Sequence, residues 1–158
     1  MGQNEVDATV SRLRASGVAF ELLSHEPVFT SAQAAAVRNA QLREGVKAMV
    51  LESNDRRFFL FCLPADKRID LEKACALAGV ERLFLAPKDS VLRVTNCEVG
   101  SVSPFSGVLS DIPVFFDHGI LGNESVEFNI GLHTRSVRMK SGDLVKLLSP
   151  AMAEFAKE

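Results

Sequence analysis

Two features that lie far apart in the chain could together bind an ester and activate it. Lys47 stands in the apolar segment 46–51, where a cation is costly unless an anion or a polar network meets it. Residues 100–104, with the sequence GSVSP, form a small-residue segment that can present bare backbone N–H groups to a ligand oxygen. The combination suggests a site for a phosphate-bearing or ester substrate that uses neither a metal nor a Ser-His-Asp triad.

Each feature also has a purely structural explanation. Lys47 could extend from a strand end into water or pair with a carboxylate, and a Gly-x-x-x-Pro segment could be an ordinary turn. The apolar neighbours of Lys47 favour the functional alternative, because a half-buried ammonium group is a good clamp for phosphate. In residues 100–104, backbone amides could position a carbonyl, and Pro104 would stiffen the loop that carries them.

Other residue types capable of chemistry do not form a recognisable pattern. The histidines, His25, His118 and His133, have no partner at metal-ligand spacing, and the cysteines are too far apart for a zinc site. We therefore expect neither a metal nor a cofactor, and a surface or hydrogen-bonding role for His25. Cys97 could be a nucleophile only if its pKa were lowered, and no Gly-x-Ser-x-Gly, Walker or Rossmann motif is present.

Composition limits the class of protein. The 158 residues fit one domain spanning 1–158, and the 47% apolar content supports a real core rich in Val, Leu, Phe and Ala. A net charge of −2 argues against a DNA-coating protein but allows a grip on the end of an RNA. No secretory signal or membrane span is visible, and three scattered cysteines indicate a reduced, cytoplasmic protein.

The elements that must position these residues follow from periodicity and capping signals. Helices are expected at about 5–16, 31–39, 70–79, 87–94 and 143–148, the last of these capped by Ser141, and a terminal helix is expected to begin at Pro150. Strands are expected at 18–22, 46–51, 57–63, 82–86, 113–117, 126–130 and 136–139. Residues 95–111 form one long irregular segment, and strands 46–51 and 57–63 are apolar on both faces, so both faces are covered. The pattern predicts an α+β fold with a curled mixed β-sheet or barrel surrounded by helices.

An ordered set of motifs adds a resemblance to a known family. The motifs are HEPVFT (25–30), GVKAMVL (45–51), LPADKRID (63–70), TNCEVGSVSPF (95–105), VFFD (114–117) and FNIG (128–131). Over roughly residues 18–148 the chain resembles the YbaK/aminoacyl-tRNA synthetase-associated domain, the free-standing relatives of the prolyl-tRNA synthetase editing domain. The resemblance implies a YbaK-like fold and deacylation in trans of tRNA mischarged with a small amino acid such as Ser, Thr, Ala or Cys.

The resemblance also implies roles for individual residues. Lys47 would anchor the phosphate or ribose of the terminal adenosine, and the Gly100–Pro104 loop would position the aminoacyl carbonyl through its backbone amides. Water would attack, assisted by a ribose hydroxyl. The implied catalytic residues are Lys47, Gly100, Ser101 and Pro104. The implied substrate-binding residues are His25, Phe29, Thr30, Val102, Ser103, Phe105, Asp117, Asn129 and Gly131.

The chain departs from the family pattern at Asn96, Ala48 and Asn129, so the resemblance leaves the amino-acid preference open. A slight lean toward small polar residues comes from the Lys47-Ala48 pair, Cys97, residues 104–106 and the Phe128-Asn129 pair, which resemble the sub-group tied to them. The expected partners are the CCA end of mischarged tRNA and an aminoacyl-tRNA synthetase as carrier, with no membrane and no DNA. Two alternatives stay open: a non-catalytic module that binds a nucleotide or tRNA end on the same fold, and a hydrolase acting on another small ester.

Overall fold

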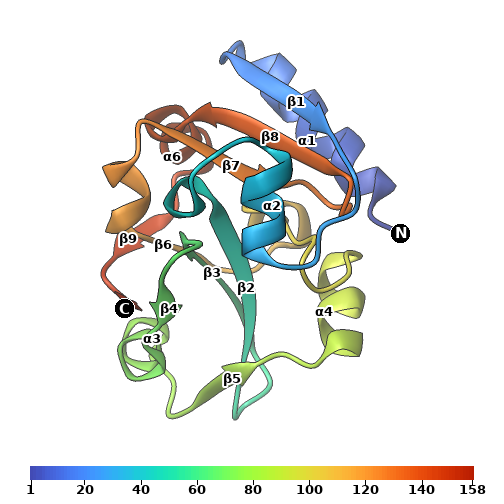
Figure 1. Cartoon of the computed structure of the whole chain (residues 1–158). Coiled ribbons are helices and arrows are strands. Elements are labelled where there is room, and N and C mark those ends of the chain that lie inside the picture. Colours follow the sequence, from blue (N-terminus) through green and yellow to red (C-terminus); the bar gives the residue numbers. More distant parts are fainter.

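The computed structural model describes residues 1–158, and its largest sheet contains five strands (Figure 1). The strands in spatial order are β5 (Leu83–Leu85), β2 (Val46–Ser53), β3 (Phe58–Pro64), β6 (Val114–Asp117) and β9 (Ala151–Ala153). β2 pairs antiparallel with β5 and β3, whereas β6 pairs parallel with β3 and with β9. The sheet is therefore mixed, as the sequence predicts.

A second, antiparallel sheet lies beside the first. It consists of β1 (Phe20–Ser24), β8 (Arg135–Lys140) and β7 (Ser125–Asn129), in that order. A single parallel bridge between Gly45 and Glu127 joins the residue before β2 to β7, so the two sheets meet at this point. The short strands β4 (Arg68–Ile69) and β10 (Ala156–Lys157) form a separate antiparallel pair.

Helices surround the sheets (Figure 1). They are α1 (Gln3–Ser16), α2 (Ser31–Val37), η1 (Leu42–Glu44), α3 (Leu71–Ala78), α4 (Lys88–Thr95), α5 (Ser106–Ser110), η2 (His118–Gly122) and α6 (Ser141–Leu148). Their ends follow local chemistry: the Asp70 side chain caps α3, Thr30 and Gln33 form a capping box for α2, and Gly17 ends α1 at φ 76°. None of the helices is long and apolar enough to cross a bilayer.

The core divides into two clusters on opposite faces of β2 and β3. The larger cluster of 20 buried residues includes Leu60 and Cys62, and α1 closes it with Leu13. The smaller cluster of 8 includes Phe61, whose ring meets Phe155 edge-on at 5.0 Å. Successive residues of β3 therefore point into different clusters. The prediction that the central strands are covered on both faces is confirmed.

Three expectations about local structure are wrong. Residues 95–111 are not wholly irregular, because α5 lies within them, and α5 packs so closely on β6 that a Cβ on Gly107 would lie 1.7 Å from Val114 Cγ2. Pro150 begins no helix: β9 adds to the edge of the large sheet beside β6, and buried Phe155 fixes the chain that follows. Strand β1 begins at Phe20 rather than at residue 18. Tertiary pairing overrides local helix propensity at the C-terminal end.

Candidate functional site

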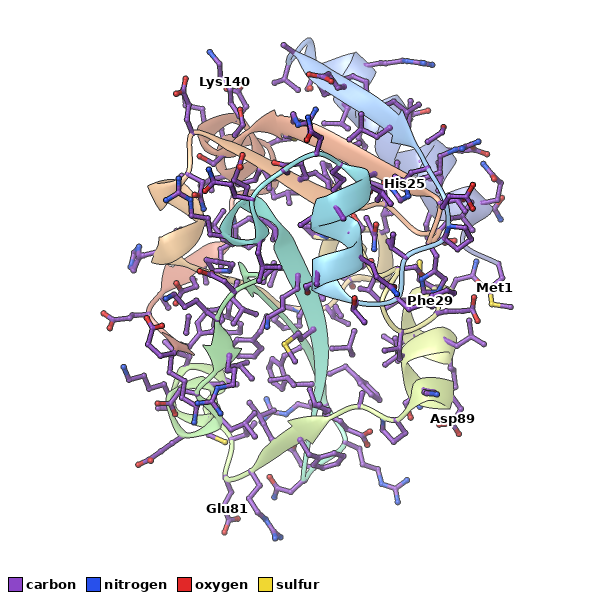
Figure 2. The ribbon with its side chains drawn as sticks, in the orientation of Figure 1. Met1, His25, Phe29, Glu81, Asp89 and Lys140 are labelled. Carbon is purple, nitrogen blue, oxygen red and sulfur yellow. The ribbon has the colours of Figure 1, made fainter.

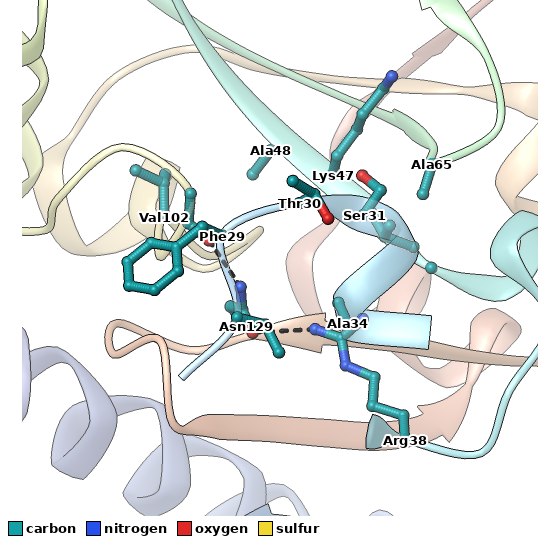
Figure 3. A pocket seen from close by; sticks show the side chains of 14 residues that line it. Phe29, Thr30, Ser31, Ala34, Arg38, Lys47, Ala48, Ala65, Val102 and Asn129 are labelled. Carbon is teal, nitrogen blue, oxygen red and sulfur yellow. Dashed lines mark hydrogen bonds between the residues drawn. The ribbon is translucent and has the colours of Figure 1, made fainter. Parts of the chain in front are cut away.

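A pocket opens at the start of β2, where α2, the loop after α4 and the end of β7 converge (Figure 3). Its volume is about 100 Å³. The residues that line it are Val28, Phe29, Thr30, Ser31, Ala34, Arg38, Gly45, Val46, Lys47, Ala48, Ala65, Gly100, Val102 and Asn129. The two motifs singled out at the beginning, the Lys47 strand and the Gly100 loop, therefore line one pocket.

The pocket brings together some of the expected site residues and leaves others outside. Those that line it are Lys47, Gly100, Val102, Phe29, Thr30 and Asn129. His25 and Phe29 lie on the connection from β1 to α2 (Figure 2), but only Phe29 reaches the pocket. Those that do not line it are His25, Ser101, Ser103, Pro104, Phe105, Asp117 and Gly131.

Lys47 provides a half-buried cation with no partner in the protein. Its ammonium group makes no hydrogen bond and no ion pair with another residue, and Figure 3 shows it directed away from Asn129. Burial lowers the pKa of Lys47, and the nearby charge of Asp66 opposes that shift. An ammonium group held beside apolar strand residues without a hydrogen bond or ion pair is available to a ligand phosphate or carboxylate.

The Gly100 loop offers fewer free amides than its sequence implies. The Ser101 N–H donates to the Glu98 carbonyl at 3.0 Å, and the Ser103 N–H donates to Ser106 Oγ at 3.2 Å. The N–H groups of Gly100 and Val102 have no acceptor in the protein, and both residues line the pocket. The donors available to a ligand oxygen are therefore these two alternate amides. Gly100 adopts φ 91°, which side chains disfavour.

The serines of the loop make hydrogen bonds within the protein, and Cys97 is buried in the core. Ser101 Oγ donates to the Glu98 carbonyl at 2.8 Å, and Ser103 Oγ accepts from the Phe105 N–H at 2.9 Å. Burial, with a smaller contribution from the Glu5 charge, raises the pKa of Cys97 to about 12. A thiol with a raised pKa is a poor nucleophile, so no side chain of this loop is prepared for covalent catalysis.

Asp117, Phe105 and Gly131 serve the fold. Asp117 Oδ1 accepts from the backbone N–H groups of Phe155 and Ala156 at 2.9 Å each, which holds the C-terminal segment against β6. Phe105 lies in the core, 6.1 Å from the ring of Phe128. A Cβ on Gly131, which has φ 127°, would lie 2.7 Å from the Gly2 carbonyl oxygen, so Gly131 allows the chain to approach the start of α1.

The sequence analysis missed Arg38, which follows α2 and is only 7% exposed. Arg38 Nε donates to Ser136 Oγ at 3.0 Å, and Nη2 donates to Asn129 Oδ1 at 2.9 Å (Figure 3). Asn129 Nδ2 in turn donates to the Gly100 carbonyl at 2.6 Å. A ring nitrogen of His25 lies 2.8 Å from Ser136 Oγ and joins the same network from outside the pocket.

The only sequence signal for this network was an arginine placed directly after an Ala-rich helix. Ala34 lines the pocket, and the small helix face leaves room for the guanidinium group of Arg38 to turn toward β7 and β8. Burial lowers the pKa of Arg38 to about 10, and the Glu127 charge opposes the shift. The group therefore stays charged at neutral pH and makes charge-assisted hydrogen bonds.

An α+β domain with an unpaired cation on one side of a small pocket, and two free amides and an asparagine on the other, has groups chemically suited to an ester or a phosphate ester. The chain belongs to the aminoacyl-tRNA editing domain family, whose model matches residues 25–147. The family expected from the ordered motifs is thereby confirmed.

Two curated relatives cover nearly the whole chain. The multifunctional Ser/Thr-tRNA deacylase ProXp-y of Escherichia coli strain K12 is 26% identical over 94% of this chain and 90% of its own length. The prolyl-tRNA editing protein ProX of Acetoanaerobium sticklandii is 26% identical over 94% of this chain and 93% of its own length. A crystal structure described as a candidate trans-editing enzyme for prolyl-tRNA synthetase has a TM-score of 0.80 at 22% identity, covers 98% of each chain, and shows the common fold.

Proposed function

We propose that this protein is a trans-acting aminoacyl-tRNA deacylase, an ester hydrolase that removes a small amino acid from mischarged tRNA. One observation carries the proposal: in an editing-family domain, Lys47, whose ammonium group is unpaired, lines the same pocket as Gly100 and Val102, whose backbone amides are free. A cation suits the phosphodiester backbone of an RNA end, and paired amides suit the carbonyl of an aminoacyl ester. Both relatives named above are editing proteins that act on tRNA.

The proposed substrate is the CCA end of the tRNA, with its aminoacyl group in the pocket. Lys47 holds the phosphate or ribose of the terminal adenosine, and the Gly100 and Val102 amides polarise the ester carbonyl. A water molecule attacks that carbonyl, and the ribose hydroxyl assists its deprotonation. The bond between the carbonyl carbon and the ribose oxygen then breaks, so that free amino acid and tRNA with its terminal hydroxyl leave. No side chain forms a covalent intermediate in this scheme.

The pocket favours a small polar amino acid. Its volume of about 100 Å³ suits a small side chain, and Thr30, Ser31 and Asn129 supply polar groups around it. Exclusion by size is effective, whereas a hydrophobic pocket gains only about 1–3 kcal/mol from one methylene. We therefore propose serine and threonine as the first candidates, followed by alanine and cysteine.

We further propose that residues 1–158 act as one domain in the cytoplasm, with a synthetase supplying the tRNA. The low net charge of −2 supports a grip on the RNA end alone, since few phosphates can be neutralised. The three cysteines are free, which suits a reducing compartment.

A non-catalytic module that binds the tRNA end is the second candidate. The observation in its favour is that no carboxylate or histidine, the usual general bases, lines the pocket, and His25 lies outside it with its ring at Ser136. One assay separates the two functions. Ser-, Thr-, Ala-, Cys- and Pro-charged tRNAs are incubated with the protein and with Lys47→Ala, and both ester hydrolysis and RNA binding are measured. Saturable binding without hydrolysis of any substrate would establish the binding module.

A further inference from the structure

The orientation of the Asn129 side-chain amide is determined by its neighbours. Its Oδ1 accepts from Arg38 Nη2 at 2.9 Å and from Ser136 Oγ at 3.1 Å. Both of these groups donate, so the oxygen of the amide must face them and Nδ2 must face the opposite way. There Nδ2 meets the carbonyl of Gly100 at 2.6 Å.

That contact fixes one peptide plane of the Gly100 loop from both sides. The carbonyl of Gly100 accepts from Asn129, and the N–H of Ser101, which belongs to the same peptide unit, donates to the Glu98 carbonyl at 3.0 Å. Because a peptide unit is planar, these two bonds set its rotation. The neighbouring peptide units on each side carry the free N–H groups of Gly100 and Val102.

We propose that Arg38 is a positioning residue for the deacylation reaction. It holds the Asn129 amide in one orientation, Asn129 holds the Gly100–Ser101 peptide, and that peptide aims the Gly100 and Val102 amides at the ester carbonyl. The inference rests on the proposed function, but the geometry that it describes exists without substrate. Arg38 suits the role because a planar guanidinium group can donate to Ser136 and Asn129 at once, which a lysine ammonium on a flexible chain does less rigidly.

Glu127 complicates a simple test of Arg38. Its side chain is fully buried on β7, and neither carboxylate oxygen has a hydrogen-bond partner. Arg38 and Arg138 are the cations whose charges act on this carboxyl group, and Glu44 and Glu21 act against them. Removing Arg38 alone takes away a compensating charge and destabilises the fold for a reason unrelated to positioning.

The experiment therefore uses two variants that remove the guanidinium hydrogen bonds of Arg38 without leaving the Glu127 charge uncompensated. Arg38→Lys keeps the charge, and Arg38→Met combined with Glu127→Gln removes both charges together. Arg138→Gln is the charge control, because it removes the other cation near Glu127; Arg138 touches Arg38 only at the backbone carbonyl and has no contact with Asn129. Single-turnover rates and KM are measured on the best aminoacyl-tRNA from the panel. Thermal melting shows that each variant is folded, and NMR follows hydrogen exchange of the Asn129 side-chain amide in the free protein.

We expect both Arg38 variants to lower the single-turnover rate by about tenfold or more with KM little changed, since misplacement by about 1 Å can cost about a hundredfold. Exchange of the Asn129 amide protons should become faster. Asn129→Ala should be slow as well, and adding Arg38→Lys to it should cause no further loss, because Arg38 acts through Asn129. Arg138→Gln should keep the wild-type rate and slow amide exchange.

Two results would overturn the proposal: wild-type rates in the folded Arg38 variants, or losses in the Arg38→Lys/Asn129→Ala variant equal to the product of the single losses. The failure of the proposed function would look different. In that case the wild-type protein would hydrolyse none of the substrates, while the exchange of the Asn129 amide would still report whether Arg38 holds it.

Discussion

The two sides of the pocket are built in contrasting ways. On one side Lys47 extends from β2 with no hydrogen bond or ion pair, so its ammonium group is free to adjust to a ligand. On the other side Gly100 and Asn129 belong to a continuous hydrogen-bond network with Arg38 and Ser136. The difference indicates two separate roles. The Lys47 side can attract a negatively charged group, and the side with Gly100 and Asn129 holds hydrogen-bond donors in a fixed geometry.

Such a division suits the proposed substrate. A phosphodiester is a diffuse anion that a flexible cation can bind from several positions. In the transition state of ester hydrolysis, by contrast, the carbonyl oxygen needs donors within hydrogen-bond distance. We therefore expect a loss on the Lys47 side to reduce binding and alignment together. A loss on the Gly100 side should chiefly reduce the chemical step.

The largest effect is expected on the side of the fixed donors. Gly100→Val places a β-branched side chain at φ 91°, and its Cβ alone would lie 3.3 Å from His133 Cε1. Loss of one oxyanion-type donor costs about 2.7–4 kcal/mol, so the single-turnover rate should fall by about a hundredfold or more. Gly142→Ala is the control, because a Cβ there has no neighbour within 4 Å. Near-normal deacylation by Gly100→Val would remove the donor role of this loop.

Removing the free cation should have an effect of similar or somewhat smaller size. Lys47→Ala loses the group that aligns the RNA end, and misalignment of about 1 Å costs on the order of a hundredfold in rate. Its melting temperature should stay close to that of the wild type, because Lys47 makes no bond that stabilises the fold. Lys67→Ala, which removes a lysine paired with Glu158 outside the pocket, should keep its activity. If Lys47→Ala turned over at the wild-type rate, Lys47 would not belong to the site.

Glu127 is buried on β7, near the Arg38 charge, and should make the stability of the fold depend on pH. Burial and then the Glu44 charge raise its pKa from 4.5 to about 7, with the charges of Arg138 and Arg38 opposing. A carboxyl group with a raised pKa in the folded state favours folding at low pH, so the free energy of unfolding should fall as the pH rises from about 5 to about 7. The slope from this group is up to about 1.4 kcal/mol per pH unit. Denaturant titrations of wild type and Glu127→Gln across this range test it, since only the wild type should show this component.

The smallest effects on rate are expected at the side chains of the loop. Ser101→Ala, Ser103→Ala and Cys97→Ser should keep most of their activity, because none of these groups is a nucleophile in the proposed reaction. Ser103→Ala should nevertheless lose stability, by about 1–3 kcal/mol, because the buried Phe105 N–H loses its acceptor. Rates and melting curves are measured on the same preparations. An inactive Ser103→Ala or Cys97→Ser beside an active Gly100→Val would indicate covalent catalysis.

The amino-acid sequence by itself determined the family and most of the helices and strands. The local signals are strands that alternate or are apolar on both faces, residues that cap helices, and glycines in turns. These signals placed the Lys47 strand and the Gly100 loop correctly. The ordered motifs identified the editing family, which the family model confirms. These features are readable because the physical preference of each segment depends on residues close to it in the chain.

The tertiary structure alone decided which polar groups make hydrogen bonds within the protein and which remain available to a ligand. Arg38 reaches Ser136 and Asn129 across 98 and 91 positions of the chain, and Asp117 binds Phe155 and Ala156 in the C-terminal segment. Hydrogen bonds between distant segments leave no periodic trace in the sequence, because any polar residue can be satisfied by water until folding brings a partner. The same reason explains why only two amides of the Gly100 loop remain available, although the sequence presents the whole loop as a candidate.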